Sequence, residues 1–119
     1  MYFFDSYAFI EILKGNSNYI KFQKSEFVTT KLNLMEVYYR ILKEFNLQDA
    51  NKFFEETLEF VIEIENEVIK EAMIFRLQNS KRNLSYIDCI GYVTAKKNGL
   101  KFLTGDIQFK DMENVEFVQ

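Results

Sequence analysis

The chain has 119 residues, of which 48% are hydrophobic and 28% are charged, with a net charge of −3 at pH 7. This composition predicts one compact domain, residues 1–119. With no transmembrane-length apolar run and no signal peptide, we expect a cytoplasmic protein without a membrane partner. The sequence has no histidine and a single cysteine, Cys89, which excludes an internal disulfide, histidine-containing catalytic triads and most zinc sites. The acidic balance argues against a broad basic surface for nucleic acid, but not against chemistry on nucleic acid.

Strands and helices are predicted to alternate in the first part of the chain. Residues 2–4 form an apolar run that indicates a buried strand, and a helix then begins at Asp5-Ser6 and stops at Gly15. Residues 27–28 indicate a second strand, after which Thr30 is placed to cap a helix that reaches about residue 45. Glu36 lies beside the predicted apolar face of this helix, which consists of Leu32, Met35, Tyr39 and Leu42.

The middle of the chain continues this alternation. An amphipathic helix is predicted from residue 48 to about 59, and residues 60–64 show the alternating pattern of a third strand. Residues 65–78 are predicted to be helical again. After a polar break, Ser85 opens a helix that ends at Asn98-Gly99.

The end of the chain adds two more strands. Residues 101–103 form a strand that runs into Thr104-Gly105-Asp106, and residues 115–118 are predicted to form a final edge strand. Strands that alternate with helices predict a mainly parallel sheet covered on both faces. In such a sheet the ligand crevice lies at the carboxyl ends of the strands.

Four acidic residues interrupt or end segments that otherwise suit a core: Asp5, Glu36, Asp88 and Asp106. Asp5 and Asp106 each follow a strand, so parallel neighbouring strands would place both at one rim of the sheet. The other two lie in the first two turns of helices that begin at the same rim. Because an ionised carboxylate is costly to bury without a partner, four together indicate a metal site.

Each acid also has an ordinary structural interpretation. Asp5 could cap the first helix, Asp88 completes a capping box with Ser85, and Asp106 could be a turn residue. Glu36 is harder to explain, because it lies among apolar residues of its helix. Considered together, the four acids favour a shared site. Six basic residues of the C-terminal third are interpreted as solvated surface: Lys81, Arg82, Lys96, Lys97, Lys101 and Lys110.

The sequence has Phe3-Phe4-Asp5-Ser6-Tyr7-Ala8 at its N-terminus and Glu36 in the helix after Val28-Thr29-Thr30. Together with a third, C-terminal segment, these residues resemble PIN-domain proteins, in particular the short VapC-type toxins of toxin–antitoxin pairs. The most specific part of this resemblance is the block Leu84–Ala95 followed by Gly99–Phe109, which contains Asp88 and Thr104-Gly105-Asp106. The resemblance covers nearly the full chain and implies an α/β fold, a PIN-like three-layer α/β/α sandwich with a mainly parallel central sheet.

The resemblance implies an endoribonuclease that depends on Mg²⁺ or Mn²⁺ and cleaves RNA phosphodiester bonds with a metal-activated water. It also implies an antitoxin partner, and a homodimer is plausible. The residues carried over as both catalytic and metal-binding are Asp5, Glu36, Asp88 and Asp106, with Ser6 and Thr104 in accessory polar positions. Asp111 is a further acid, which we interpret as a residue of a surface turn.

Two alternative functions stay open. The first is a non-catalytic PIN-like scaffold, or a regulatory module that binds a cation without cutting RNA; the presence of all four acids disfavours it. The second is phosphoryl transfer, as in haloacid-dehalogenase phosphatases or response-regulator receivers. Asp5-Ser6-Tyr7 lacks the second aspartate that the phosphatases need, and the sequence also lacks the paired N-terminal acids of the receivers.

The sequence also predicts two features of the packing, one at Gly91 and one among the aromatic residues. Gly91 interrupts a helix, which costs about 1 kcal/mol relative to alanine, so we expect it to permit close approach of this helix to the sheet. The chain also has more aromatic residues than a small core needs, which suggests an exposed apolar groove or a dimer face, although a core accounts for about half of them. The aromatic residues in question are Phe9, Tyr19, Phe22, Tyr38, Tyr39, Phe53 and Phe54.

Overall fold

The computed structural model describes all 119 residues and contains a four-stranded sheet in which every pairing is parallel. The strand order is β2-β1-β3-β4. Strand β1 (Tyr2–Phe4) lies between β2 (Phe27–Val28) and β3 (Lys101–Thr104), and β4 (Val115–Phe117) forms the far edge. The predicted parallel sheet with a C-terminal edge strand is therefore confirmed.

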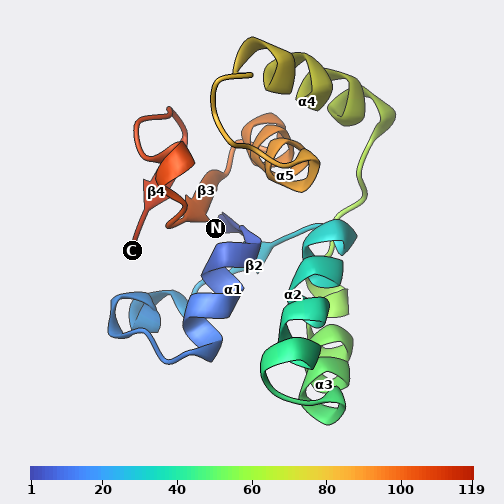
Figure 1. Cartoon of the computed structure of the whole chain (residues 1–119), viewed down its shortest axis with the longest axis vertical. Helices are drawn as coiled ribbons and strands as arrows, with labels where there is room; N and C mark the ends of the chain where they lie inside the picture. The colour runs from blue at the N-terminus through green and yellow to red at the C-terminus, as the bar shows by residue number, and fades with distance from the viewer.

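Helices cover the sheet on two sides (Figure 1). One side carries α4 (Asn66–Gln78) and α5 (Tyr86–Lys97). The other carries three helices, α1 (Ser6–Leu13), α2 (Lys31–Glu44) and α3 (Leu47–Thr57). No helix is long and apolar enough to cross a membrane. This arrangement confirms the predicted three-layer α/β/α sandwich.

The core consists of two layers because successive strand residues point to opposite faces of the sheet. Phe3 and Phe102 face α4 and α5, and their rings stack with centroids 5.7 Å apart. Phe4 and Leu103 face the layer of α1, α2 and α3. Cys89, on α5, is fully buried in the first of these layers. The short central strands are thus buried on both faces, as expected for a parallel sheet.

The predicted strand over residues 60–64 is wrong. Residues 58–60 form the short 3₁₀ helix η2 (Leu58–Phe60), and Val61 makes only an isolated parallel bridge with Thr29. Two backbone hydrogen bonds hold this bridge, Thr29 N–H to the Phe60 carbonyl and Ile62 N–H to the Thr29 carbonyl, at 3.1 and 2.9 Å. The pairing ends there because the chain turns into α2 at Thr30, so no longer edge is available.

The predicted apolar face of α2 is also wrong. The buried residues of α2 are Asn33, Leu34, Val37 and Ile41. Met35 and Tyr39 instead leave 53% and 65% of their surface exposed. Apolar residues occur on both sides of this helix, and the side that packs against α1 and α3 is the one that is buried. Periodicity alone could not distinguish the two stripes.

The remaining helix ends follow the predicted signals closely. Thr30 caps α2 by accepting a hydrogen bond from the Asn33 N–H, and Ser85 forms a full capping box with Asp88. Gly15 follows α1 with φ of 77°, in the left-handed region that favours glycine. Two further 3₁₀ helices, η1 (Ser17–Phe22) and η3 (Ile107–Phe109), were not predicted.

Most of the surplus aromatic residues are packed inside the protein. Three of the seven are buried, namely Phe9, Tyr19 and Phe22. Tyr38, Phe53 and Phe54 are half-buried, and only Tyr39 is exposed. The core interpretation therefore explains more of these residues than the sequence analysis assigned to it.

Two glycines permit close contacts at the sheet. A Cβ atom on Gly91 would lie 3.2 Å from a ring carbon of Phe3 and 3.2 Å from one of Phe102, so α5 packs directly on both rings. A Cβ atom on Gly105 would lie 2.3 Å from the Tyr7 ring and 2.3 Å from the Val118 carbonyl oxygen. The second distance leaves no room for any side chain, because a backbone oxygen cannot move away as a flexible side chain can.

Replacing Gly91 with alanine should lower the stability of the protein. The gain in helix propensity, about 1 kcal/mol, is opposed by overpacking against two buried rings, which typically costs about 1–3 kcal/mol. Thermal unfolding of Gly91→Ala should therefore give a lower Tm than the wild type. A Tm equal to or above that of the wild type would show that the rings yield and that the close approach is not required.

Replacing Gly105 with alanine should be more damaging. The added methyl group would meet a backbone carbonyl and the Tyr7 ring together, so we expect a loss near the upper end of the overpacking range, about 3 kcal/mol. Urea unfolding of Gly105→Ala beside Gly91→Ala tests the ranking. A smaller loss for Gly105→Ala than for Gly91→Ala would contradict the expectation.

Candidate metal-binding active site

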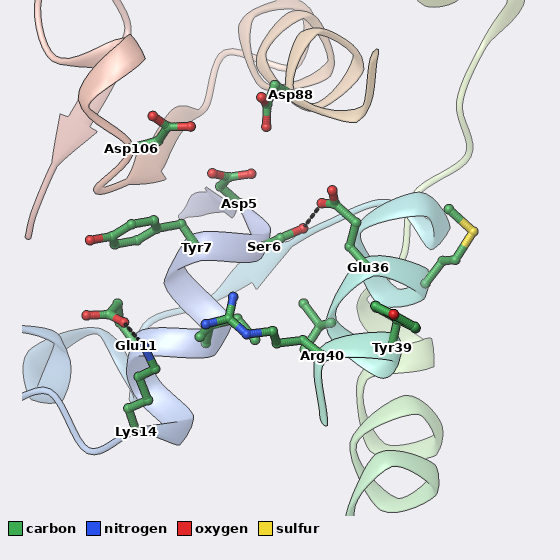
Figure 2. Close-up of a pocket in the computed structure, with 13 residues that line it drawn as sticks. Asp5, Ser6, Tyr7, Glu11, Lys14, Glu36, Tyr39, Arg40, Asp88 and Asp106 are labelled. Atoms are coloured by element: carbon green, nitrogen blue, oxygen red, sulfur yellow. Dashed lines mark hydrogen bonds and ion pairs between the residues drawn. The ribbon is translucent and has the colours of Figure 1, made fainter. Parts of the chain in front are cut away.

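A cleft of about 830 Å³ opens at the carboxyl ends of β1 and β3, and all four predicted acids line it. They come from separate parts of the chain. Asp5 follows β1, Asp106 follows β3, and Glu36 and Asp88 lie on α2 and α5. Figure 2 shows Asp5 between Asp88 and Asp106 on one side and Glu36 on the other. The structure thus confirms that the four acids converge at one rim of the sheet, as predicted.

Asp5 is the most deeply placed of the four, with 3% of its surface exposed. Its backbone N–H donates to the Leu103 carbonyl at 3.1 Å, which ties it to β3. Although Asp5 is the N-cap residue of α1, its carboxylate makes no capping hydrogen bond. Capping therefore does not explain this buried carboxylate.

Thr104 connects Asp5 to Asp106. Its hydroxyl donates to Asp5 Oδ2 at 2.7 Å and accepts from the Asp106 N–H at 3.1 Å. Asp106 Oδ1 accepts from the Gln108 N–H at 2.9 Å, the turn interaction expected of an aspartate there. The turn fixes one carboxylate oxygen and leaves Oδ2 without a hydrogen bond.

Asp88 both completes the capping box of α5 and lines the cleft. Its Oδ2 atom accepts from the Ser85 N–H at 2.8 Å, and its own N–H donates to Ser85 Oγ at 3.0 Å, which completes the capping box. Oδ1 takes no part in this box. Capping and cleft lining are therefore compatible, because each uses a different oxygen.

A chain of polar side chains holds Glu36. Ser6 Oγ donates to Glu36 Oε1 at 2.6 Å and accepts from Asn33 Nδ2 at 3.0 Å. Asn33 Oδ1 in turn accepts from the Thr30 hydroxyl at 2.6 Å. Asn33 is fully buried and was not among the residues predicted from the sequence. The only feature that could have pointed to it is that it is a polar residue on a stripe of α2 that is otherwise apolar.

No ion pair balances the negative charges of the four carboxylates. Burial raises the pKa of Asp5 to about 7; Asp88 adds to the rise, and the Thr104 hydrogen bond opposes it. Burial also raises the pKa of Glu36 and of Asp88. None of the four acids forms an ion pair with a lysine or arginine. Such a cluster favours a bound cation as the missing positive charge.

The donor set fits a hard divalent cation that keeps part of its water shell. The cleft offers carboxylate and hydroxyl oxygens and no nitrogen or sulfur ligand of the kind that zinc prefers. No three of the acids are close enough together to enclose an ion by themselves. Mg²⁺ is commonly bound through one or two carboxylates and several waters, so this open spacing suits it.

The basic residues of the cleft differ from those noted in the sequence. Lys14 and Arg40 line it, and neither was identified by sequence analysis. The six basic residues of the C-terminal third are exposed and lie outside the cleft, as the surface interpretation predicts. Asp111 is likewise exposed, in a turn after η3.

The fold of the chain is similar to that of several solved structures. One is a toxin–antitoxin complex from Klebsiella pneumoniae, with a TM-score of 0.77 and 18% identity, covering 98% of this chain and 96% of that chain. Another is Mycobacterium tuberculosis VapC20, a sarcin–ricin loop cleaving toxin, with a TM-score of 0.77, 14% identity and coverage of 97% and 98%. A third is VapBC2 from Rickettsia felis bound to a DNA fragment from the promoter, with a TM-score of 0.70, 15% identity and coverage of 98% and 96%.

Identities this low show a shared fold and nothing finer. No curated protein matches the sequence. The sequence does match the PIN domain over residues 2–115, a range that contains all four acids and every element of the sheet except the end of β4. On this match across nearly its whole length, the chain belongs to the PIN-domain family.

Proposed function

We propose that the protein is an endoribonuclease that requires Mg²⁺ or Mn²⁺ and serves as the toxin of a toxin–antitoxin pair. PIN-domain proteins are generally nucleases. The observation that supports the proposal most strongly is the meeting of Asp5, Glu36, Asp88 and Asp106 in one cleft, where none of them forms an ion pair with a lysine or arginine. Placing four carboxylates together without a countercharge is so unfavourable that a bound cation is the simplest reason for it.

The four acids would hold the cation directly or through water. When bound, a divalent ion supplies a water of lowered pKa and neutralises charge on a phosphate. The protein itself would hold the carboxylates in place. Thr104 restrains Asp5, and Ser6 restrains Glu36. Such supporting hydrogen bonds typically change metal affinity or activity by about 10- to 100-fold when they are removed.

A protein partner forms a second part of the proposal. Structural neighbours of the chain are toxin–antitoxin complexes, which suggests an antitoxin here as well. Exposed apolar residues on and after α2, of which Met35 and Tyr39 line the cleft, offer a surface for it, and those of α4 offer one for a homodimer. RNA as the substrate would place the activity in the cytoplasm. The exposed residues are Met35, Tyr39, Leu42, Phe45 and Leu47 on and after α2 and Ile69, Ile74 and Leu77 on α4.

Cleavage of total RNA by the purified protein should require Mg²⁺ or Mn²⁺ and should disappear in Asp88→Asn. Asparagine keeps an acceptor for the Ser85 N–H, so this change removes the charge while preserving the helix cap. Asp111→Asn is the matched control, because Asp111 is an exposed acid outside the cleft. Equal cleavage by wild type and Asp88→Asn, or cleavage that survives a chelator, would refute the proposed site.

Mn²⁺ should raise the Tm of the wild-type protein but not that of Asp5→Asn. A ligand that binds only the folded state stabilises it by about 2.7 kcal/mol at 100 times its dissociation constant. Without metal, Asp5→Asn should itself have the higher Tm, since it removes a buried carboxylate that has no countercharge. An equal Mn²⁺ shift in both proteins would mean that the ion binds elsewhere. A shift without RNA cleavage would favour the regulatory module that binds a cation.

A further inference from the structure

The cleft is larger than a metal site requires and extends away from the four carboxylates along α1 and α2. Figure 2 shows the acids at the rim of the sheet, and Lys14 and Arg40 further along the two helices. These are the only basic side chains that line the cleft. The cleft therefore has an acidic end with four carboxylates and a cationic end, where Glu11 also lies beside Lys14.

Arg40 occupies a defined place relative to the acids. It lies four residues after Glu36 on α2, which is about one helical turn, or roughly 5–6 Å. Its side chain is part-exposed, and its Nε atom pairs with the carboxylate of Glu44, one turn further along.

The two terminal nitrogens of Arg40 are the important ones. Neither Nη1 nor Nη2 donates a hydrogen bond to any protein group, so both are free for a ligand in the cleft. A guanidinium group with two free parallel donors matches the geometry of a phosphate group. Both terminal nitrogens of Arg40 are thus available to a ligand.

Lys14, at the end of α1, is held loosely. Its ammonium group is 3.7 Å from Glu11 Oε2, with 47% of the side chain exposed. Exposed pairs of this kind contribute little to stability, so the ammonium group is free to turn toward a ligand. Glu11 keeps a second partner, because Asn16 Nδ2 donates to its Oε1 atom at 2.9 Å.

We propose that Arg40, assisted by Lys14, binds a phosphate group of the RNA backbone that neighbours the scissile phosphate. The inference rests on the proposed ribonuclease function and names substrate-positioning residues for it. The scissile phosphate lies at the carboxylates, where a cation balances the charge, and the strand continues along α1 and α2 to the guanidinium group. Such a contact recognises the backbone and carries no sequence preference.

The charges that line the cleft favour an RNA backbone over other ligands at the cationic end. The ligand must be anionic, because it meets Arg40 and Lys14, and must also extend to a cation site lined by four carboxylates. A chain of phosphates meets both requirements, since each phosphate carries its own charge. Arg40 would therefore fix the register of the strand relative to the metal.

Binding of a fluorescently labelled single-stranded RNA of mixed sequence tests the inference. The parent protein is Asp88→Asn in the presence of Mn²⁺, so that bound RNA is not cut. Adding Arg40→Gln should weaken binding about ten-fold and reduce the slope of log K against log salt by about 0.7, the value for one phosphate contact on a single strand. Lys43→Gln is the matched control, an exposed lysine of α2 outside the cleft, and should change neither quantity.

Glu44→Gln separates phosphate binding from helix stability. It breaks the ion pair of Arg40 but keeps the guanidinium group, so RNA binding should stay equal or become tighter. If Glu44→Gln weakens binding as much as Arg40→Gln, the ion pair is what matters and the inference is overturned. RNA binding that is absent in the parent, or unchanged by Arg40→Gln, overturns it as well.

A cleavage assay distinguishes failure of the inference from failure of the proposed function. In an otherwise wild-type protein, Arg40→Gln should raise KM about ten-fold with a much smaller change in kcat, because a uniform binding contact is lost. Cleavage with an unchanged KM would refute the role of Arg40 and leave the ribonuclease intact. Arg40-dependent RNA binding without cleavage in any variant would support the contact between Arg40 and an RNA phosphate and refute the ribonuclease, and with it the place of that phosphate beside a scissile one.

Discussion

Removal of the Asp5 carboxylate from water is the constraint on which the rest of the structure depends. Burial and the neighbouring Asp88 raise the pKa of this group to about 7, so the folded chain holds charge there at a cost. The cost arises because Asp5 directly follows the central β1, where helices cover both faces of the sheet. The hydroxyl of Thr104 reduces it, but no basic side chain removes it. The fold therefore keeps a buried carboxylate at a position where no side chain of the protein supplies a countercharge.

The frame that holds the acids is rigid because it is made of core contacts. Asp88 lies three residues before Gly91, where α5 rests on the rings of Phe3 and Phe102. Glu36 depends on a buried hydrogen-bond chain through Ser6 and Asn33. Each acid is thus oriented by groups that also stabilise the fold, and sites held in this way keep their geometry when a ligand binds.

Local signals predicted most of the fold and the place of the acids. Thr30 and Ser85 marked helix starts correctly, and the strand-to-acid junctions at Asp5 and Asp106 placed both residues at one rim. Long-range competition explains the errors. Val61 had the pattern of a strand, but its only partner was the short end of β2, and α2 had two apolar stripes of which tertiary packing buried one. Asn33 was missed because its hydrogen bond to Ser6 of α1 is a tertiary contact, and Arg40 was missed because only the fold places it in one cleft with Lys14 of α1.

The burial of Cys89 beside Asp88 has a practical consequence for studying motion. Burial raises the pKa of its thiol to about 11, with a contribution from Asp88, and the side chain has no exposed surface. Thiol reagents are attacked by the thiolate form of cysteine, so the closed protein is nearly inert to them. Cys89 is the only thiol in the chain. The rate of its chemical labelling therefore reports how often α5 lifts from the sheet, and so measures transient opening beside the cleft.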